Sequence, residues 1–290
     1  MSVEGADVSV QRRRALACML AAATGAALPA CVTRQRPAAG DRLHNPLLWA
    51  VAWKQTAAEY RALCYQAFNV ATMRLDLAVA RRQPGDRPLA IITDVDDTVL
   101  HAPSYWGHLV DQGLDFFDDA IWDAWVPQNL VTAAPGASAF LHYAASQGVE
   151  VFYVTNRDQG EETAAYALAH LRLLEFPFAD EAHLTVLRET SDKTAAREAV
   201  AARFDVVLLL GDNLNDFSRD YYLTDVDARL ARADADRDLY GARYIVLPNP
   251  TDGHWVRAIF GDSEPAPTDA NRATLKAAAT RSAWDGRPRR

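Results

Sequence analysis

Residues 89–98 read LAIITDVDDT, and this stretch decides the fold. It begins as an uninterrupted apolar run, which is typical of a strand buried on both faces of a parallel sheet. Because successive side chains of a strand point to opposite sides, Asp94 and Asp96 are predicted to point the same way. The sequence therefore places two carboxylates in one small site at the end of a strand.

Four further apolar runs of strand length follow, at residues 149–155, 184–187, 206–210 and 244–247. Segments of helical composition separate them, at residues 137–147, 161–174 and 192–203. This alternation predicts an α/β fold, a Rossmann-like parallel sheet with helices on both faces, in which ligands bind outside the carboxyl ends of the strands. Residues 46–82 precede the sheet and are predicted to form one long helix or two short ones.

Polar groups suited to phosphate or a metal follow three more of these strands. The turn Thr155-Asn156-Arg157 offers a hydroxyl and backbone N–H groups to phosphoryl oxygens. The ammonium of Lys193, at the start of a predicted helix, is a compact charge for the same oxygens. Asp212 follows the most hydrophobic run and adds a carboxylate for an ion.

Asp94 and Asp96 can divide the work of phosphate transfer between them. One acid can act as the nucleophile while the other protonates the leaving group and later activates water. Their combined charge would repel a phosphate ester unless a cation intervenes, and ligands that are all oxygen predict Mg²⁺ rather than zinc. The sequence thus predicts a magnesium-dependent hydrolysis of a small phosphomonoester.

Four ordered motifs carry a family resemblance: DxDxT at 94–98, TNR at 155–157, Lys193, and GDxxxD at 211–216. In this order, each after a strand, they resemble the haloacid-dehalogenase-like phosphohydrolase superfamily. The runs FYVTNR at 152–157 and GDNLNDF at 211–217 resemble its class C acid phosphatases and bacterial lipoprotein 5′-nucleotidases. The resemblance spans about residues 45–260.

The resemblance implies roles for single residues of the reaction centre. Asp94 would be the nucleophile and a metal ligand, and Asp96 the general acid and base with its backbone carbonyl on the metal. Asp212 would be the second carboxylate ligand. Thr155, Asn156 and Lys193 would bind the phosphoryl group.

Three further residues receive outer roles from the same resemblance. Asp216 would lie behind the metal ligands, where it orients a water or Lys193. Asp97 is a third acid in this outer position with no specific role. Arg157 is predicted to contact the substrate.

An aromatic-rich insert at about residues 101–134 is predicted to form a small cap over the pocket. Trp122 and Trp125 are its candidate substrate-binding residues, because aromatic rings stack on nucleobases. Their three-residue spacing equally suits packing of the cap onto the core. The nucleotidases place a second aromatic in their closing segment, where this chain has Asp252, so a nucleotide preference stays open.

The first 30 residues are predicted to be a lipoprotein signal peptide. Arg12, Arg13 and Arg14 precede an apolar stretch, and the Ala30-Cys31 step resembles a lipobox. Cys31 would then carry the lipid of an exported bacterial lipoprotein, anchored at the outer membrane or the periplasmic face. Export by the Sec or the twin-arginine route, cleavage after Ala30 without lipidation, an uncleaved anchor and a buried N-terminal helix stay open.

The rest of the chain is predicted to form a tether, one domain and a tail. Residues 31–45 form the flexible tether, 46–262 the phosphohydrolase domain, and 263–290 a disordered tail. A net charge of −8 over 290 residues argues against a nucleic-acid partner, which needs a basic groove.

Two other functions remain open from the sequence. One is a catalytically inactive surface lipoprotein that binds a ligand or partner, and the other is a phosphotransferase. The oligomeric state is not predicted.

Overall fold

The computed structural model describes residues 45–284. The predicted signal peptide, Cys31 and all of the tether except Asn45 lie outside the described residues. Among residues 45–284, no helix combines the length and the apolar composition needed to cross a membrane.

The sequence 46–82 forms two helices, α2 (Leu47–Thr56) and α3 (Ala58–Arg81). They are separated at Ala57, whose backbone is extended with φ −76° and ψ 126°. The inner side of α3 buries residues at spacings of three and four, namely Tyr60, Cys64, Phe68, Ala71 and Leu75. This spacing makes one apolar stripe, so α3 packs along its whole length.

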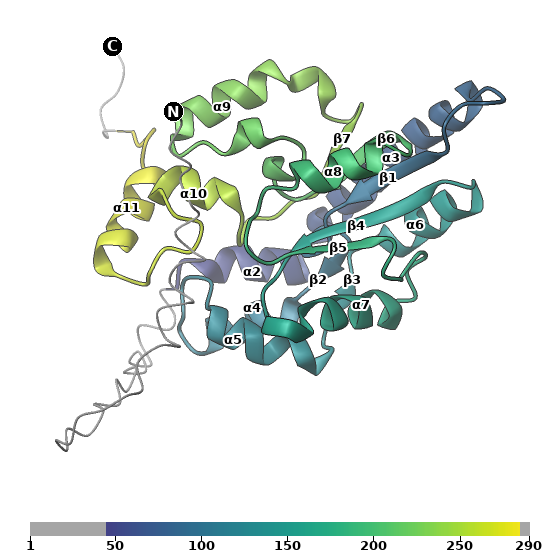
Figure 1. The fold of residues 1–290 in the computed structure, drawn as a ribbon. Coiled ribbons are helices and arrows are strands. Elements are labelled where there is room, and N and C mark those ends of the chain that lie inside the picture. Colours follow the sequence, from purple (N-terminus) through teal and green to yellow (C-terminus); the bar gives the residue numbers. More distant parts are fainter. Residues whose placement is uncertain (1–44, 285–290) are drawn as a thin grey trace, which may run out of the picture.

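Five strands form one parallel sheet, as the sequence predicted, and their order is β5-β4-β1-β6-β7 (Figure 1). The strands are β1 (Leu89–Thr93), β4 (Glu150–Asn156), β5 (Leu184–Leu187), β6 (Asp205–Gly211) and β7 (Tyr244–Val246). The central strand β1 is buried throughout. Asp94, the residue that follows it, therefore lies near the middle of the sheet edge.

Alternate residues of β1 enter two separate cores, one on each face of the sheet. Leu89 and Ile91 join the larger core, which α3 and α6 (Ala137–Ser146) cover. Ala90 and Ile92 join the smaller core, which includes Val200 of α8 (Thr194–Ala201). Helix α7 (Thr163–Leu173) lies along β5. The sheet thus carries helices on both faces, as predicted.

The aromatic insert is joined to the body through a short antiparallel pair, β2 (Leu100–His101) and β3 (Thr132–Ala133). Between these strands lie α4 (Pro103–Asp111), α5 (Asp119–Trp125) and the 3₁₀ helix η2 (Val126–Gln128). Helix α4 packs on α2, which lies directly above the insert in Figure 1.

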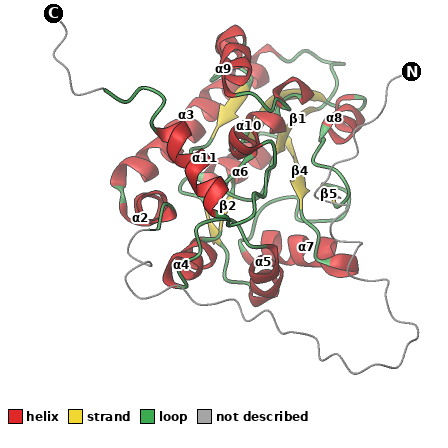
Figure 2. Cartoon of the chain, turned by 90° about the vertical axis from the view of Figure 1, so that its left-hand side faces the viewer, coloured by secondary structure: helices red, strands yellow, loops and turns green. Residues whose placement is uncertain are grey.

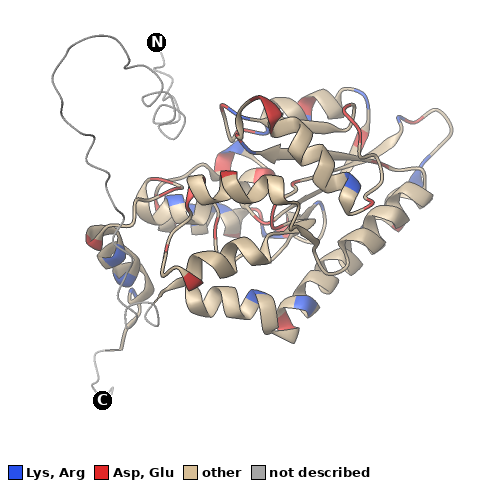
Figure 3. Cartoon of the chain, turned by 90° about the horizontal axis from the view of Figure 1, so that it is seen from below, with Lys and Arg blue, Asp and Glu red and all other residues tan. Residues whose placement is uncertain are grey.

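The remaining helices complete the C-terminal half. They are η3 (Gly160–Glu162), η4 (Leu214–Asp216), η5 (Arg219–Tyr221), α9 (Val226–Ala235), η6 (Arg237–Leu239), α10 (His254–Phe260) and α11 (Asp269–Ala279). Seen from below, acidic and basic positions are interspersed over the ribbon (Figure 3).

Helix α11 (Asp269–Ala279) corrects the prediction of a disordered tail for the part of residues 263–290 that it covers. It begins at the cap residue Thr268, whose hydroxyl accepts a hydrogen bond from the backbone N–H of Asn271, and it packs beside α10 (Figure 2). Arg272 fixes it through hydrogen bonds of 2.6 and 3.1 Å to the carboxylate of Asp115. A polar composition was mistaken for disorder, because the partner that orders this helix lies far away in sequence.

Candidate active site

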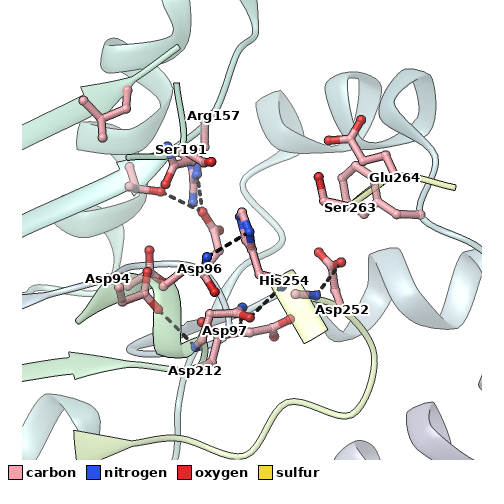
Figure 4. A pocket seen from close by; sticks show the side chains of 18 of the residues that line it. Asp94, Asp96, Asp97, Arg157, Ser191, Asp212, Asp252, His254, Ser263 and Glu264 are labelled. Carbon is pink, nitrogen blue, oxygen red and sulfur yellow. Dashed lines mark hydrogen bonds and ion pairs between the residues drawn. The ribbon is translucent and has the colours of Figure 1, made fainter. Parts of the chain in front are cut away.

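Loops at the carboxyl end of the sheet meet in one pocket (Figure 4). Asp94 and Asp96 follow β1, Thr155 and Asn156 end β4, and Asp212 follows β6. All five side chains line the pocket. The structure therefore brings together residues that the sequence predicted from three different strands.

Lys193 reaches this pocket from the start of α8 and is 4% exposed. Its ammonium forms ion pairs with Oδ1 of Asp94 and, at 2.8 Å, with Oδ1 of Asp216. Burial lowers the pKa of Lys193, but the Asp216 and Asp94 carboxylates outweigh this effect and the net shift is upward. A charged ammonium thus lies directly beside the predicted nucleophile.

The loop after β6 holds Asp216 in a fixed position behind Lys193. The second oxygen of Asp216 accepts a hydrogen bond of 3.1 Å from the backbone N–H of Asn213. Gly211 makes this turn feasible, since a Cβ there would lie 2.6 Å from the Cβ of Asp216. Asp216 therefore contacts Lys193, the residue that it was predicted to orient.

Three carboxylates form a group that suits a metal ion. One oxygen each from Asp94, Asp212 and Asp216 lies within 4.8 Å of the others. Thr98 holds two of them together, donating at 3.0 Å to Asp94 or at 3.2 Å to Asp212. Burial, followed by the charge of Asp94 and then of Asp216, raises the pKa of Asp212. A divalent cation would relieve this repulsion, and an all-oxygen donor set fits Mg²⁺.

Asp94 lies in the same buried electrostatic environment. Burial raises the pKa of its carboxyl, Lys193 opposes this, and the charges of Asp216 and Asp96 add to the rise. The net shift is upward. A cation beside Asp94 would favour the ionised form that a nucleophile needs.

The side chain of Asp96 is directed away from this group, toward Arg157. Its carboxylate accepts hydrogen bonds from Arg157 Nη2 at 2.6 Å and Nε at 2.7 Å, and from the Thr155 hydroxyl at 3.1 Å. Burial raises the pKa of Asp96, but the charge and hydrogen bonds of Arg157 outweigh it and the net shift is downward. The carboxylate of Asp96 is thus engaged by Arg157 and Thr155, and the metal contact of its backbone carbonyl stays a prediction.

Arg157 does not take the position of a substrate-contacting side chain. Its side chain is fully buried, and its remaining nitrogen Nη1 lies 3.0 Å from Nδ1 of His170. The predicted contact of Arg157 with substrate is therefore corrected. Arg157 lines the pocket wall, and its guanidinium contacts Asp96 and His170. Sequence reasoning overlooked Asp96, three residues after the end of β1, as the partner of Arg157.

The predicted phosphate-binding residues all line the pocket, although each already has a protein partner. Thr155 donates to Asp96, and Nδ2 of Asn156 donates to the backbone carbonyl of Thr190 at 2.7 Å. Lys193 contacts two carboxylates. These donors face a common space from β4 and α8.

The cap supplies an aromatic wall to the pocket, formed by Trp106, Phe117 and Trp122. Trp125 is not part of it. Its ring stacks on Trp122 with centroids 5.1 Å apart, its Nε1 donates to the Ser104 hydroxyl at 2.9 Å, and it is 7% exposed. Because they are three residues apart on α5, the two tryptophan side chains project from the helix in different directions. Trp122 lines the pocket and Trp125 packs into the core.

A comparison with protein families agrees with this arrangement. The family model described as HAD superfamily, subfamily IIIB (Acid phosphatase) matches residues 39–255. The chain belongs to this acid phosphatase family. It is therefore a phosphoric monoester hydrolase.

Two solved structures of the class C acid phosphatase from Bacillus anthracis are similar to this acid phosphatase. One, with tungstate bound, is 30% identical over 82% of this chain and 97% of its own, with a TM-score of 0.74. The other is 28% identical over 84% of this chain and its own full length, with a TM-score of 0.75. The resemblance to class C acid phosphatases is confirmed.

The far wall of the acid phosphatase pocket comes from the closing segment, with Asp252, His254, Ser263 and Glu264 (Figure 4). Burial raises the pKa of Asp252 to about 6. Ser263 and Glu264 were missed because they fall in the segment predicted as a tail. No local motif marks them as pocket residues.

Two further residues of this acid phosphatase were missed as site residues, Lys54 on α2 and Asn249 after β7. Nδ2 of Asn249 donates to Oδ2 of Asp212 at 2.7 Å, and Lys54 forms a 2.8 Å ion pair with Asp97. Lys54 lies on a helix without any polar motif. Only the docking of α2 beside the sheet edge brings it there.

Proposed function

We propose that this acid phosphatase hydrolyses small phosphomonoesters through an aspartyl-phosphate on Asp94 and depends on Mg²⁺. The ion would be held by Asp94, Asp212 and the backbone carbonyl of Asp96. The observation that carries this proposal is the ion pair of Lys193 with Asp94, inside a group of three carboxylates. Mg²⁺ would supply positive charge against the phosphoryl oxygens.

The chain's own residues account for the remaining steps. Lys193, Thr155 and Asn156 hold the phosphoryl group while an Asp94 oxygen attacks phosphorus and the bond to the leaving oxygen breaks. Asp96, protonated at the start of the cycle, gives its proton to that oxygen. It then takes a proton from the water that attacks phosphorus, and the bond from phosphorus to Asp94 breaks, which releases phosphate and restores both acids. Arg157 supports the second step because it stabilises the ionised Asp96 that accepts this proton.

Hydrolysis of p-nitrophenyl phosphate tests the proposal. We expect EDTA to abolish activity and Mg²⁺ to restore it. Asp94→Asn should lower turnover at least about a thousand-fold, as is usual for a lost nucleophile. The control is Asp238→Asn, whose side chain is 96% exposed and lies outside the pocket. Wild-type activity in Asp94→Asn would remove the aspartyl-phosphate from the proposal.

The two open alternatives have separate outcomes in the same assay. Absence of hydrolysis of every phosphomonoester in a panel, with Mg²⁺ present, would favour a binding protein. Transfer of phosphate to an added alcohol, at the expense of free phosphate, would favour a phosphotransferase.

The favoured substrates are phosphomonoesters whose leaving group carries a ring, such as nucleoside 5′-monophosphates. The aromatic wall of Trp106, Phe117 and Trp122 supports this choice, because rings of a ligand stack on such side chains. Asp252 lies where a second stacking residue would be needed. We expect kcat/KM for nucleoside 5′-monophosphates to exceed that for glycerol phosphate, and equal values would contradict a nucleotidase.

We further propose that the enzyme is an exported bacterial lipoprotein with its lipid on Cys31. The support is the sequence of the first 31 residues, with its basic start, apolar middle and Ala30-Cys31 step. Labelling with a radioactive fatty acid should be lost in Cys31→Ala and kept in Cys18→Ala. Label retained in Cys31→Ala would contradict the anchor.

A further inference from the structure

Lys54 is a buried cation that faces the reaction centre from outside the sheet. It belongs to α2, and its side chain is 8% exposed. Its ammonium lies 2.8 Å from Oδ1 of Asp97, 3.0 Å from the Thr251 hydroxyl and 3.3 Å from Oδ1 of Asn249. No step of the proposed reaction uses this ammonium, so its burial needs another explanation.

Lys54 is one of three donors, with the backbone N–H and the hydroxyl of Thr251, that surround the amide oxygen of Asn249. The amide oxygen faces Lys54 and Thr251, whose backbone N–H and hydroxyl lie at 3.1 and 2.7 Å. The amide nitrogen then faces Asp212 at 2.7 Å and Asp97 at 3.3 Å. A reversed amide would set its oxygen against two carboxylates, so the donors around Oδ1 enforce the observed orientation.

Asp97 is the second link between Lys54 and the reaction centre. Its backbone lies in the left-handed region with φ 55°, and its carboxylate is shared between Lys54 and Asn249. Lys54, Asp97 and Asn249 therefore form one polar cluster behind Asp212. Such outer contacts fix the orientation of a metal ligand.

We propose that Lys54 is a positioning residue that orients Asp212 for the metal ion, through Asn249 and Asp97. The inference rests on the proposed magnesium dependence. It makes the docking of α2 a condition for a complete metal site, although α2 contributes no ligand itself.

Whether the Kd for Mg²⁺ rises or falls when Lys54 is removed distinguishes a positioning role from a purely electrostatic one. A positive charge near the ion repels it, so removing Lys54 would tighten Mg²⁺ binding if charge alone mattered. Loss of orientation weakens binding, and lost outer contacts typically cost about 10- to 100-fold in metal affinity. Positioning therefore predicts a higher Kd in spite of the removed repulsion.

Calorimetric titration of the metal-free full chain with Mg²⁺ measures this sign. We expect Lys54→Met to raise the Kd at least about tenfold. The matched control is Lys276→Met, which removes the same charge from an exposed position on α11. An unchanged or lower Kd in Lys54→Met would overturn the inference, whereas absence of binding by the wild type would overturn the proposed magnesium dependence.

A second variant tests the route of the effect. Asn249→Ala keeps the ammonium but removes the donor to Asp212, so it should also raise the Kd. In the Asn249→Ala background, Lys54→Met should add clearly less than it does alone. Full additivity would overturn the route through Asn249. Should Lys54→Met fail to fold in EDTA, an unchanged Kd in Asn249→Ala alone would still overturn it.

Discussion

Arg157 donates two hydrogen bonds to the carboxylate of Asp96, from Nη2 at 2.6 Å and from Nε at 2.7 Å. The arginine side chain is completely buried, and that of Asp96 is 27% exposed. This bidentate pair fixes the direction in which the proposed acid and base points. It also keeps a buried charge neutralised in the wall of the pocket.

Arg157→Met should therefore destabilise the protein as well as impair turnover. Breaking a buried pair by removing one partner costs about 3 kcal/mol or more, because the other charge is left unpaired. We expect the free energy of unfolding in urea to fall by about this amount. In the Asp96→Asn background the same change should cost clearly less, and an equal cost in both backgrounds would contradict the pairing argument.

Metal binding should appear as a gain in thermal stability. A ligand at a hundred times its Kd stabilises the folded state by about 2.7 kcal/mol. We expect Mg²⁺ to raise the Tm of the wild type but not that of Asp212→Asn. Without metal, Asp212→Asn should be at least as stable as the wild type, since it removes the repulsion that raises the pKa of Asp212. A normal Mg²⁺ response in this variant would exclude Asp212 as a ligand.

The two neighbouring cap tryptophans should respond differently to truncation. Trp122→Ala removes part of the pocket wall and should raise KM for ring-bearing esters with a smaller effect on glycerol phosphate. Trp125→Ala leaves a cavity in the core and should lower the free energy of unfolding by about 3 kcal/mol. Kinetics on both esters, together with urea unfolding, separate the two. A selective KM effect in Trp125→Ala would contradict its placement.

Helix α11 should contribute measurably to stability through Arg272. The Asp115 side chain is 6% exposed, whereas Arg272 is 42% exposed and partly screened by water. Arg272→Ala is therefore expected to cost only about 1 kcal/mol of unfolding free energy. Asp115→Asn should reduce the cost of the Arg272 change. A wild-type unfolding curve for Arg272→Ala would show that this pair does not hold the helix.

Much of this site followed from sequence because its residues are placed by the backbone alone. Asp94, Thr155 and Asp212 each follow an apolar run, and parallel strands bring their carboxyl ends to one edge. Knowing the strands was therefore enough to group these residues. The same reasoning located Lys193, whose helix begins at that edge.

The direction in which a side chain points was harder to predict from the sequence than the position of its residue. Arg157 was expected to face the substrate and instead faces Asp96. For Trp125 the spacing left the pocket and the core equally open, and the ring packs on Trp122 in the core. Each choice depends on which partner is nearest once the chain is folded. Spacing along the sequence leaves both directions open.

The sequence by itself determined the parallel sheet, the order of the motifs and the meeting of Asp94 and Asp212 at one edge, because these depend on local apolar patterns and on strand ends. Only the tertiary structure decided that Lys54 lies behind Asp212, that Arg272 of α11 pairs with Asp115, and which cap rings line the pocket. These contacts join segments far apart in the chain, and their partners are selected by packing and by the pairing of buried charges. No local pattern encodes that selection.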